Sequence, residues 1–310
     1  MEKRIVVFGS ANMDLVVSAE RLPRAGETLL GGDLKFVPGG KGANQACAAA
    51  RLGGRVSMTG AVGTDSFGPA LLESLGAAGV DTSGMTRSSK ATGCALISVL
   101  PGGENAILVA PGANMAVEAG TVRRFVETLE NVGFLLCQLE TPVEAVQAAL
   151  AAARAIGAIT ILDPAPARPL PEELLRQVDI LTPNQSEAAL LVGSTDMVID
   201  SFQTAATTAA RLRELGCGAV IVKLGAAGCW IDDGQRQEAA PGFAVEAVDT
   251  TAAGDVFNGA LAVALAEGKP LQEAARFANA AAAISVTRAG AQTSVPQREE
   301  VDRFLAGMRT

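Results

Sequence analysis

The 310-residue chain contains no histidine. The Ser–His–Asp triad, the Cys–His dyad and the HExxH zinc site each need an imidazole, so all three are excluded. The chain also lacks a Walker A loop, because no Ser or Thr follows the lysine of Gly39-Gly40-Lys41-Gly42, and no GxGxxG follows the first predicted strand. Any chemistry must therefore use carboxylates, lysines, thiols, backbone amides or a metal ion.

Cysteines are few and show no pairing pattern. There are five of them, none in a CxxC motif, so at least one must be unpaired. Together with the lack of a recognisable signal peptide, this pattern is typical of a protein of the reducing cytoplasm. No apolar run reaches the roughly 18–20 residues that a membrane helix needs, so we expect no membrane segment.

Bulk composition limits the remaining possibilities. Apolar residues make up 49% of the chain and charged residues 19%, which favours a large folded core over disorder. The net charge of −8 argues against a nucleic-acid surface, although backbone amides and metal ions can still bind nucleotides. The length suits one large α/β domain with an appendage.

Predicted strands and helices alternate along most of the chain. We expect strands at 4–9, 56–62, 134–139, 158–163, 178–182, 219–224 and 229–232, and helices at 43–52, 66–78, 117–129, 142–156, 187–192, 201–215, 253–267 and 271–288. Alternation of this kind predicts a largely parallel sheet covered by helices on both faces. The hairpin-like regions 13–37 and 91–109 do not fit that scheme. We expect them to pair into a small second sheet over one edge of the core.

One segment carries the equipment for moving a phosphoryl group. Residues 249–255 lead into a predicted helix, whose first turn offers unpaired amides and partial positive charge to a phosphate. Gly254 lets a ligand approach the backbone closely. Asp255 can accept a proton from a substrate hydroxyl, and its place at a helix start predicts a lowered pKa. A loose phosphoryl-transfer transition state tolerates such a weak base. The alternative is an aspartate that only stabilises the first helical turn.

Other motifs lie near strand ends, where ligands bind in open α/β sheets. Asn12 and Asp14 are suited to holding neighbouring hydroxyls of a polyol, or form an ordinary Asx turn. Glycines before Lys41 expose amides, or form a plain turn. Glu187 can support hydrated Mg²⁺ through water, or is a first-turn glutamate. The segment 223–228 can shelter nucleotide phosphates, or is a simple hairpin.

In this order the motifs resemble those of the ribokinase-like sugar kinases, the phosphofructokinase-B family. The resemblance runs from end to end and is carried by segments 39–44, 138–140, 163–168, 180–184, 249–257, 287–292 and 294–296. It implies a three-layer α/β sandwich with a mostly parallel central sheet, a single kinase domain over residues 1–310, and a small β-sheet lid formed by about 13–37 and 91–109. It also implies a homodimer formed through the lid sheet.

The resemblance implies an ATP-dependent kinase acting on the 5-hydroxyl of ribose. Asp255 would be the general base, and the amides of Ala252, Ala253 and Gly254 would form the anion hole. Residues implied to hold the sugar are Asn12, Asp14, Gly40, Lys41, Gly42, Asn44 and Glu140. Residues implied to line the ATP site are Asn184, Lys223, Gly225, Gly228, Gly254 and Asn279.

Two metal ions are implied as well. Glu187 would belong to a Mg²⁺ motif and act through water. A monovalent cation, K⁺, would support the anion-hole loop from outside the substrate site. Its implied positions, several acting through backbone carbonyls, are Asp249, Thr251, Ser285, Arg288, Gly290 and Ser294.

Two positions bear on the choice of substrate and nucleotide contact. Lys223 stands where related kinases usually carry a threonine, and it either reaches phosphate or points away. Asn12 is the form typical of ribose-specific members, since its amide can bond the 2-hydroxyl that deoxyribose lacks. The alternatives are a deoxyribokinase, fructokinase or nucleoside kinase, or a non-catalytic sugar sensor. The presence of Asp255 and Gly254 argues against the sensor.

Overall fold

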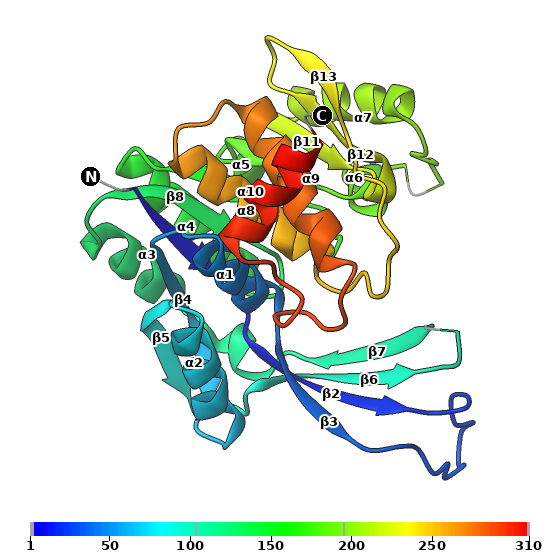
Figure 1. Ribbon diagram of the computed structural model, residues 1–310. Coiled ribbons are helices and arrows are strands. Elements are labelled where there is room, and N and C mark those ends of the chain that lie inside the picture. The colour runs from blue at the N-terminus through cyan, green and yellow to red at the C-terminus, as the bar shows by residue number, and fades with distance from the viewer. Residues whose placement is uncertain (1–2, 103, 195, 309–310) are drawn as a thin grey trace.

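The computed structural model describes residues 3–102, 104–194 and 196–308 (Figure 1). Its centre is a nine-stranded sheet of order β13-β12-β11-β10-β9-β8-β1-β4-β5. The strands are β1 (Arg4–Phe8), β4 (Val56–Gly63), β5 (Asp81–Ser88), β8 (Val132–Cys137), β9 (Ile159–Leu162), β10 (Ile180–Leu181), β11 (Ala219–Lys223), β12 (Gly228–Asp232) and β13 (Gln237–Pro241). Pairing is parallel from β5 to β11 and antiparallel at β12 and β13.

Helices cover both faces of this sheet, as the alternating pattern predicts. One face carries α1 (Lys41–Arg51), α2 (Phe67–Ala77), α8 (Ala253–Ala266), α9 (Leu271–Ser285) and α10 (Arg298–Gly307). The other carries α3 (Ala119–Thr128), α4 (Val143–Ala155), α5 (Glu172–Leu175), α6 (Gln185–Leu191) and α7 (Phe202–Glu214). Strand β1 shows why both faces are apolar: Ile5 and Val7 enter one core, and Val6 and Phe8 enter the other.

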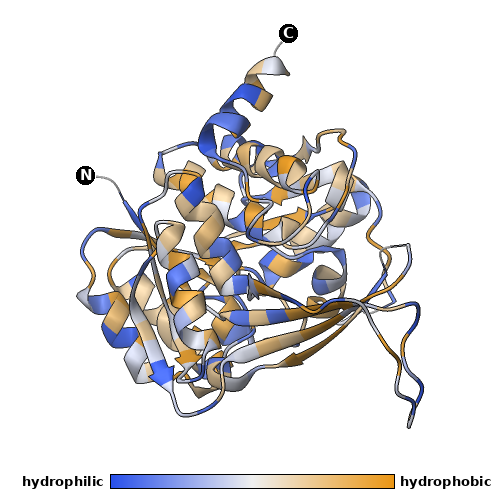
Figure 2. Ribbon diagram, turned by 60° about the horizontal axis from the view of Figure 1, so that its bottom comes forward, coloured by the Kyte–Doolittle hydropathy of each residue, from blue (hydrophilic) through white to orange (hydrophobic). Residues whose placement is uncertain are grey.

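The two hairpin-like regions form the expected second sheet. Its order is β3-β2-β6-β7, with β2 (Asn12–Ser18), β3 (Lys35–Gly39), β6 (Gly93–Val99) and β7 (Asn105–Ala110). This sheet extends from one end of the sandwich (Figure 1). It has many apolar residues, shown in orange in Figure 2, and Phe36, Ile107 and Leu108 are 55–68% exposed.

Two strands, β5 and β13, and two helices, α5 and α10, were not predicted from the sequence. Strands β5 and β13 form the two edges of the central sheet, and their polar sequences lack an alternating apolar pattern. The prediction that two alanine-rich helices close the chain is wrong, because α10 follows them. That helix buries only Val301 and is otherwise charged or partly exposed. Within the described residues, no helix combines the length and apolarity needed to cross a membrane.

Candidate active site

Asp255 lies in the first turn of α8 and is only 5% exposed. Both of its carboxylate oxygens accept hydrogen bonds from α1. The Asn44 Nδ2 group donates to Oδ2 at 3.0 Å, and the Gln45 Nε2 group donates to Oδ1 at 3.1 Å. Asp255 is therefore held by a neighbouring helix, which an aspartate that merely stabilised its own helix would not need.

The prediction of a lowered pKa for Asp255 is wrong. Burial raises the pKa of Asp255 to about 6, with a further increase from the Asp163 charge. Lys41 and the two amide donors act in the opposite direction. The sequence argument weighed the helix start but not the depth at which the rest of the fold buries it. A carboxylate with this pKa is still mostly ionised at pH 7 and is a stronger base than an ordinary aspartate.

Backbone contacts at the start of α1 need glycine. Gly40 has φ +90°, and a Cβ there would lie 2.7 Å from the Asn12 backbone nitrogen. At Gly42 a Cβ would lie 2.6 Å from the carbonyl carbon of Gly9. The first turn of α1 therefore rests on the backbone that follows β1, which brings Lys41 and Asn44 to this end of the sheet.

Asn12 opens β2 and does not form a turn, contrary to the simpler alternative from sequence. It is 3% exposed, and its Oδ1 accepts a hydrogen bond of 2.7 Å from Asn114 Nδ2. Asn114 is itself fixed, because its Oδ1 accepts from the Ala11 amide at 3.0 Å. These bonds orient the Asn12 side chain with its NH₂ group available as a donor.

Acidic groups surround the space between β2 and α1. Burial, together with the Glu140 and Asp255 charges, raises the pKa of Asp14 to about 7. Glu140 accepts hydrogen bonds from the Ser10 hydroxyl and from the Lys41 amide, the latter at 3.1 Å. The site therefore offers several acceptors for sugar hydroxyls.

Lys41 is the cation at the centre of these acids. Burial lowers the pKa of Lys41, but the charges of Asp255, Asp163, Glu140 and Glu187 together raise it above its usual range. Its ammonium group therefore stays protonated and offsets the concentration of negative charge.

A cavity of about 920 Å³ lies next to this acidic space. The structure brings together on its wall all six residues expected for ATP binding, namely Asn184, Lys223, Gly225, Gly228, Gly254 and Asn279. Lys41 and Asp255 also line the cavity, so it reaches the candidate base. Asn279 Nδ2 donates to the Ala240 carbonyl at 3.0 Å. A cavity of this size accommodates a nucleotide.

The start of α8 also borders the cavity. Ala252, Ala253 and Gly254 all line it, and Ala252 adopts a left-handed conformation with φ 59°. The Ala253 amide makes a 3.3 Å hydrogen bond to the Thr250 carbonyl, which it must exchange to bind an anion. The first amides of a helix lack carbonyl partners one turn back, so this end of α8 can bind an anion.

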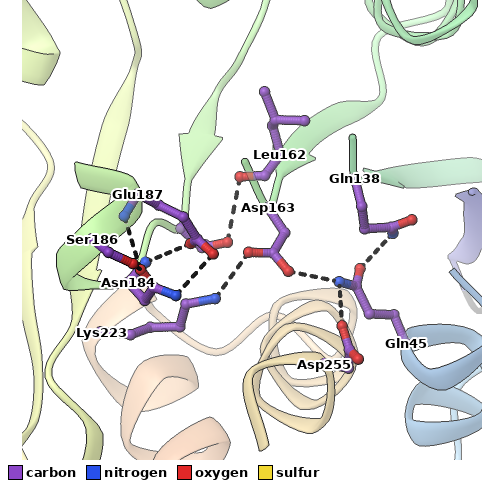
Figure 3. Close-up of polar contacts among 10 residues, drawn as sticks. Gln45, Gln138, Leu162, Asp163, Asn184, Ser186, Glu187, Lys223 and Asp255 are labelled. Atoms are coloured by element: carbon purple, nitrogen blue, oxygen red, sulfur yellow. Dashed lines mark hydrogen bonds and ion pairs between the residues drawn. The ribbon is translucent and has the colours of Figure 1, made fainter. Parts of the chain in front are cut away.

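Lys223 lines the cavity, and its ammonium group pairs with a neighbouring acidic side chain. Its Nζ lies 2.9 Å from Asp163 Oδ1, and Asp163 Oδ2 accepts a 3.0 Å hydrogen bond from Gln45 Nε2 (Figure 3). No role was assigned to Asp163 or Gln45 from sequence. The signal for Asp163 was its place directly after β9, at the same edge of the sheet as the other site residues.

Glu187 forms a capping box with Asn184 at the start of α6. The Asn184 amide and Nδ2 donate to its two carboxylate oxygens at 2.7 and 2.8 Å. Among the described residues, no group of three or more Asp, Glu or Cys side chains is placed to bind a metal ion directly. Glu187 nevertheless lines the cavity, and each of its oxygens retains further acceptor capacity for a metal-bound water.

The expected cation positions lie on two loops linked by Asp249. Its Oδ1 accepts from the Thr251 amide at 2.9 Å and its Oδ2 from the Gly290 amide at 2.8 Å. Asp249 also donates its own amide to the Val286 carbonyl at 3.1 Å. Ser285 at the end of α9 and Ser294 in the second loop are buried, and the Arg288 side chain pairs with Glu300. The structure thus joins the two loops through Asp249, and the Arg288 side chain is engaged in its ion pair with Glu300.

Comparisons with known proteins agree with this geometry. Residues 2–298 match the sequence profile of the pfkB family of carbohydrate kinases. The chain is 42% identical to the ribokinase of Haemophilus influenzae over 306 residues, covering 98% of this chain and 99% of the relative. It is also 42% identical to the ribokinase of Bacillus subtilis over 304 residues, with 98% and 100% coverage.

Solved structures give the same result. A ribokinase from Thermotoga maritima superposes with a TM-score of 0.89 at 41% identity, covering 99% of this chain and 100% of the other. An Arabidopsis thaliana ribokinase complexed with ribose and ATP also gives a TM-score of 0.89, at 36% identity with 98% and 99% coverage.

Proposed function

Because the chain belongs to the pfkB family of carbohydrate kinases, we propose that it transfers the γ-phosphoryl group of ATP to the 5-hydroxyl of ribose. The products are ribose 5-phosphate and ADP. The observation that carries the proposal is Asp255, a buried and doubly oriented carboxylate between the acidic space and the nucleotide-sized cavity. The relatives named above, which are ribokinases, support the choice of ribose.

The chemistry follows from the positions of these groups. The oxygen of the sugar hydroxyl forms a bond to the γ-phosphorus of ATP, and Asp255 accepts the proton of that hydroxyl. The bond between the γ-phosphorus and the β–γ bridging oxygen breaks at the same time, and ADP leaves. Negative charge on the transferring group lies against the start of α8, where amide donors and the helix dipole stabilise it. Positioning and electrostatics of this kind supply most of the catalysis in phosphoryl transfer.

A sugar panel with a coupled ADP assay tests the function. Ribose is expected to give the highest kcat/KM among ribose, 2-deoxyribose, fructose and adenosine. A higher value for another member would assign the chain to a different sugar or nucleoside kinase. Ribose binding without ADP release would instead indicate a sensor.

Asn12→Ala is expected to narrow the preference for ribose over 2-deoxyribose. If the oriented Asn12 amide bonds the 2-hydroxyl, its loss removes about 1.4 kcal/mol or more, so the ratio of kcat/KM values should fall roughly tenfold. The assay compares the two sugars at constant ATP. Asn105→Ala, on exposed β7 of the same small sheet, is the control and should leave the ratio unchanged. An unaltered ratio in Asn12→Ala would place the discrimination elsewhere.

Mg²⁺ is proposed to enter with ATP. Glu187, on the cavity wall, would hold the Mg²⁺ ion through a water molecule. This indirect role suits its carboxylate, because both oxygens already accept hydrogen bonds from Asn184. The metal would supply charge neutralisation at the phosphates when bound.

Activity is expected to rise with K⁺. Asp249 links the 249–251 loop, which leads into the anion hole, to the loop after α9. A cation bound there would stiffen the anion-hole loop without touching substrate. Replacing K⁺ by tetramethylammonium should lower kcat roughly tenfold, less than the 10²–10³ loss typical of deleting one anion-hole donor. Equal kcat values in the two salts at matched ionic strength would refute the proposed cation site.

We also propose that the four-stranded sheet acts as a lid over the sugar and pairs with a second copy of the chain. The exposed apolar side chains of Phe36, Leu96, Ile107 and Leu108 support this proposal. Sedimentation velocity tests the dimer.

A cytoplasmic location is proposed as well, because all five cysteines are unpaired. Cell fractionation tests it.

A further inference from the structure

A continuous chain of contacts joins the nucleotide cavity to the candidate base. Lys223 at the end of β11 pairs with Asp163 after β9, Asp163 accepts from Gln45 on α1, and Gln45 donates to Asp255 on α8 (Figure 3). Asp163 and Gln45 are buried, with exposures of 3% and 0%, and the Lys223 side chain is 12% exposed. Four separate elements of the fold therefore meet in this contact chain.

The orientation of Gln45 is fixed by a third partner. Gln138 Nε2 donates to Gln45 Oε1 at 2.6 Å, so the Gln45 NH₂ group must face the two aspartates. Its two N–H bonds go to Asp163 at 3.0 Å and Asp255 at 3.1 Å. The amide cannot flip without losing all three hydrogen bonds. Gln45 therefore holds Asp255 at a set distance from a second negative charge.

That second charge needs compensation. The Asp163 carboxylate lies close enough to Asp255 to raise its pKa. The ammonium group of Lys223 pairs with Asp163 directly, so removing either partner leaves a buried charge uncompensated. Lys223 also lies beside the anion hole, since a Cβ on Gly254 would lie 3.4 Å from its Nζ.

We propose that Gln45, Asp163 and Lys223 are positioning residues: Gln45 orients Asp255, and Lys223 forms a matched charge pair with Asp163 so that Asp255 stays ionised beside it. This inference rests on the proposed kinase function. It gives the lysine at position 223 a role, because this lysine compensates the buried aspartate at position 163.

The test is the pH profile of single-turnover phosphoryl transfer at saturating ribose and ATP. Three variants are compared with the wild type: Lys223→Met, Asp163→Asn and the double variant. Lys223→Met leaves Asp163 uncompensated, so the acidic limb of the profile should move up by about one pH unit, with roughly fivefold slower transfer at pH 6 and little loss at pH 8.5. Asp163→Asn should move the acidic limb of the pH profile to lower pH. The double variant should return it close to the wild-type position.

The other charged groups facing Asp255 are constant across this series. They are Lys41 on α1 and Asp14 on β2, together with Glu140 and Glu187, whose charges act on Lys41. Gln45→Met, which keeps the volume but loses both N–H bonds, tests the orienting role. It should lower the transfer rate about tenfold at pH 8.5 with little change in KM for ribose, and the loss should grow at lower pH because the Gln45 hydrogen bond also lowers the pKa of Asp255.

A matched control removes the cation from another buried aspartate. Arg213 lies 3.2 Å from Asp232, which is 1% exposed, and neither residue is among those lining the cavity. Arg213→Met should leave the acidic limb in place.

Three results would overturn the proposal. They are an unmoved limb in both single variants, a double variant whose limb stays as far displaced as in one of the single variants, or a Lys223→Met effect confined to a raised KM for ATP. Failure of the kinase function itself is distinct, because the wild type would then transfer no phosphate to ribose.

Discussion

Asp255→Ala is expected to lower kcat by a factor of about 10² to 10⁴ while ribose still binds. The loss follows because the carboxylate held by both Asn44 and Gln45 would no longer be present to accept the hydroxyl proton. Steady-state kinetics measures kcat, and isothermal titration with ribose measures binding. In the wild type the base form exists above the pKa of about 6, so activity should be lost as the pH falls through 6.

Two variants separate this role from helix stabilisation. Asp255→Asn keeps the shape of the side chain without its basicity and should be nearly as inactive as the alanine variant. Glu144→Ala removes an exposed acidic residue from the first turn of α4 and should retain wild-type kcat. Near-normal turnover in Asp255→Ala would refute the base assignment.

Lys41→Met is expected to lower kcat/KM for ribose about 100-fold or more. Its ammonium group faces four acidic side chains, and loss of one member of such a buried charge network typically costs about 3–5 kcal/mol. The pKa of Asp255 should also rise, because Lys41 is the strongest influence lowering it. The acidic limb of the pH profile should therefore move upward together with the loss of activity.

The control for Lys41 is Lys35→Met, on exposed β3, which removes the same charge from outside the site. Lys41→Arg keeps the charge but not the shape, so it should recover part of the activity. If Lys41→Met changed kcat/KM no more than Lys35→Met does, the charges of the acidic space would not depend on Lys41.

The central architecture could be predicted because its signals are local. The buried run of β1 and the glycines before α1 each mark an element within a few residues, and the motif ending at Asp255 marks the start of α8. Edge strands β5 and β13 escaped prediction because their place in the sheet depends on backbone pairing and not on an apolar pattern.

The electrostatics of the site could not be predicted in the same way. The pKa of Asp255 depends on burial by α1, whose Asn44 lies 211 positions away along the chain. Lys223 turns toward Asp163, 60 positions earlier, and neither segment alone indicates that contact. Both outcomes depend on which strand ends meet at one edge of the sheet, and that is a property of the assembled fold.

The connection between the four-stranded sheet and the sandwich is very short. Asn12 opens β2 and pairs with Gly39 at the end of β3, and Gly40 alone separates β3 from α1. A tilt of this sheet relative to the sandwich would therefore move Asn12 and Lys41 together. Sugar binding and the movement of the sugar hydroxyl to within reach of Asp255 would then occur in the same step.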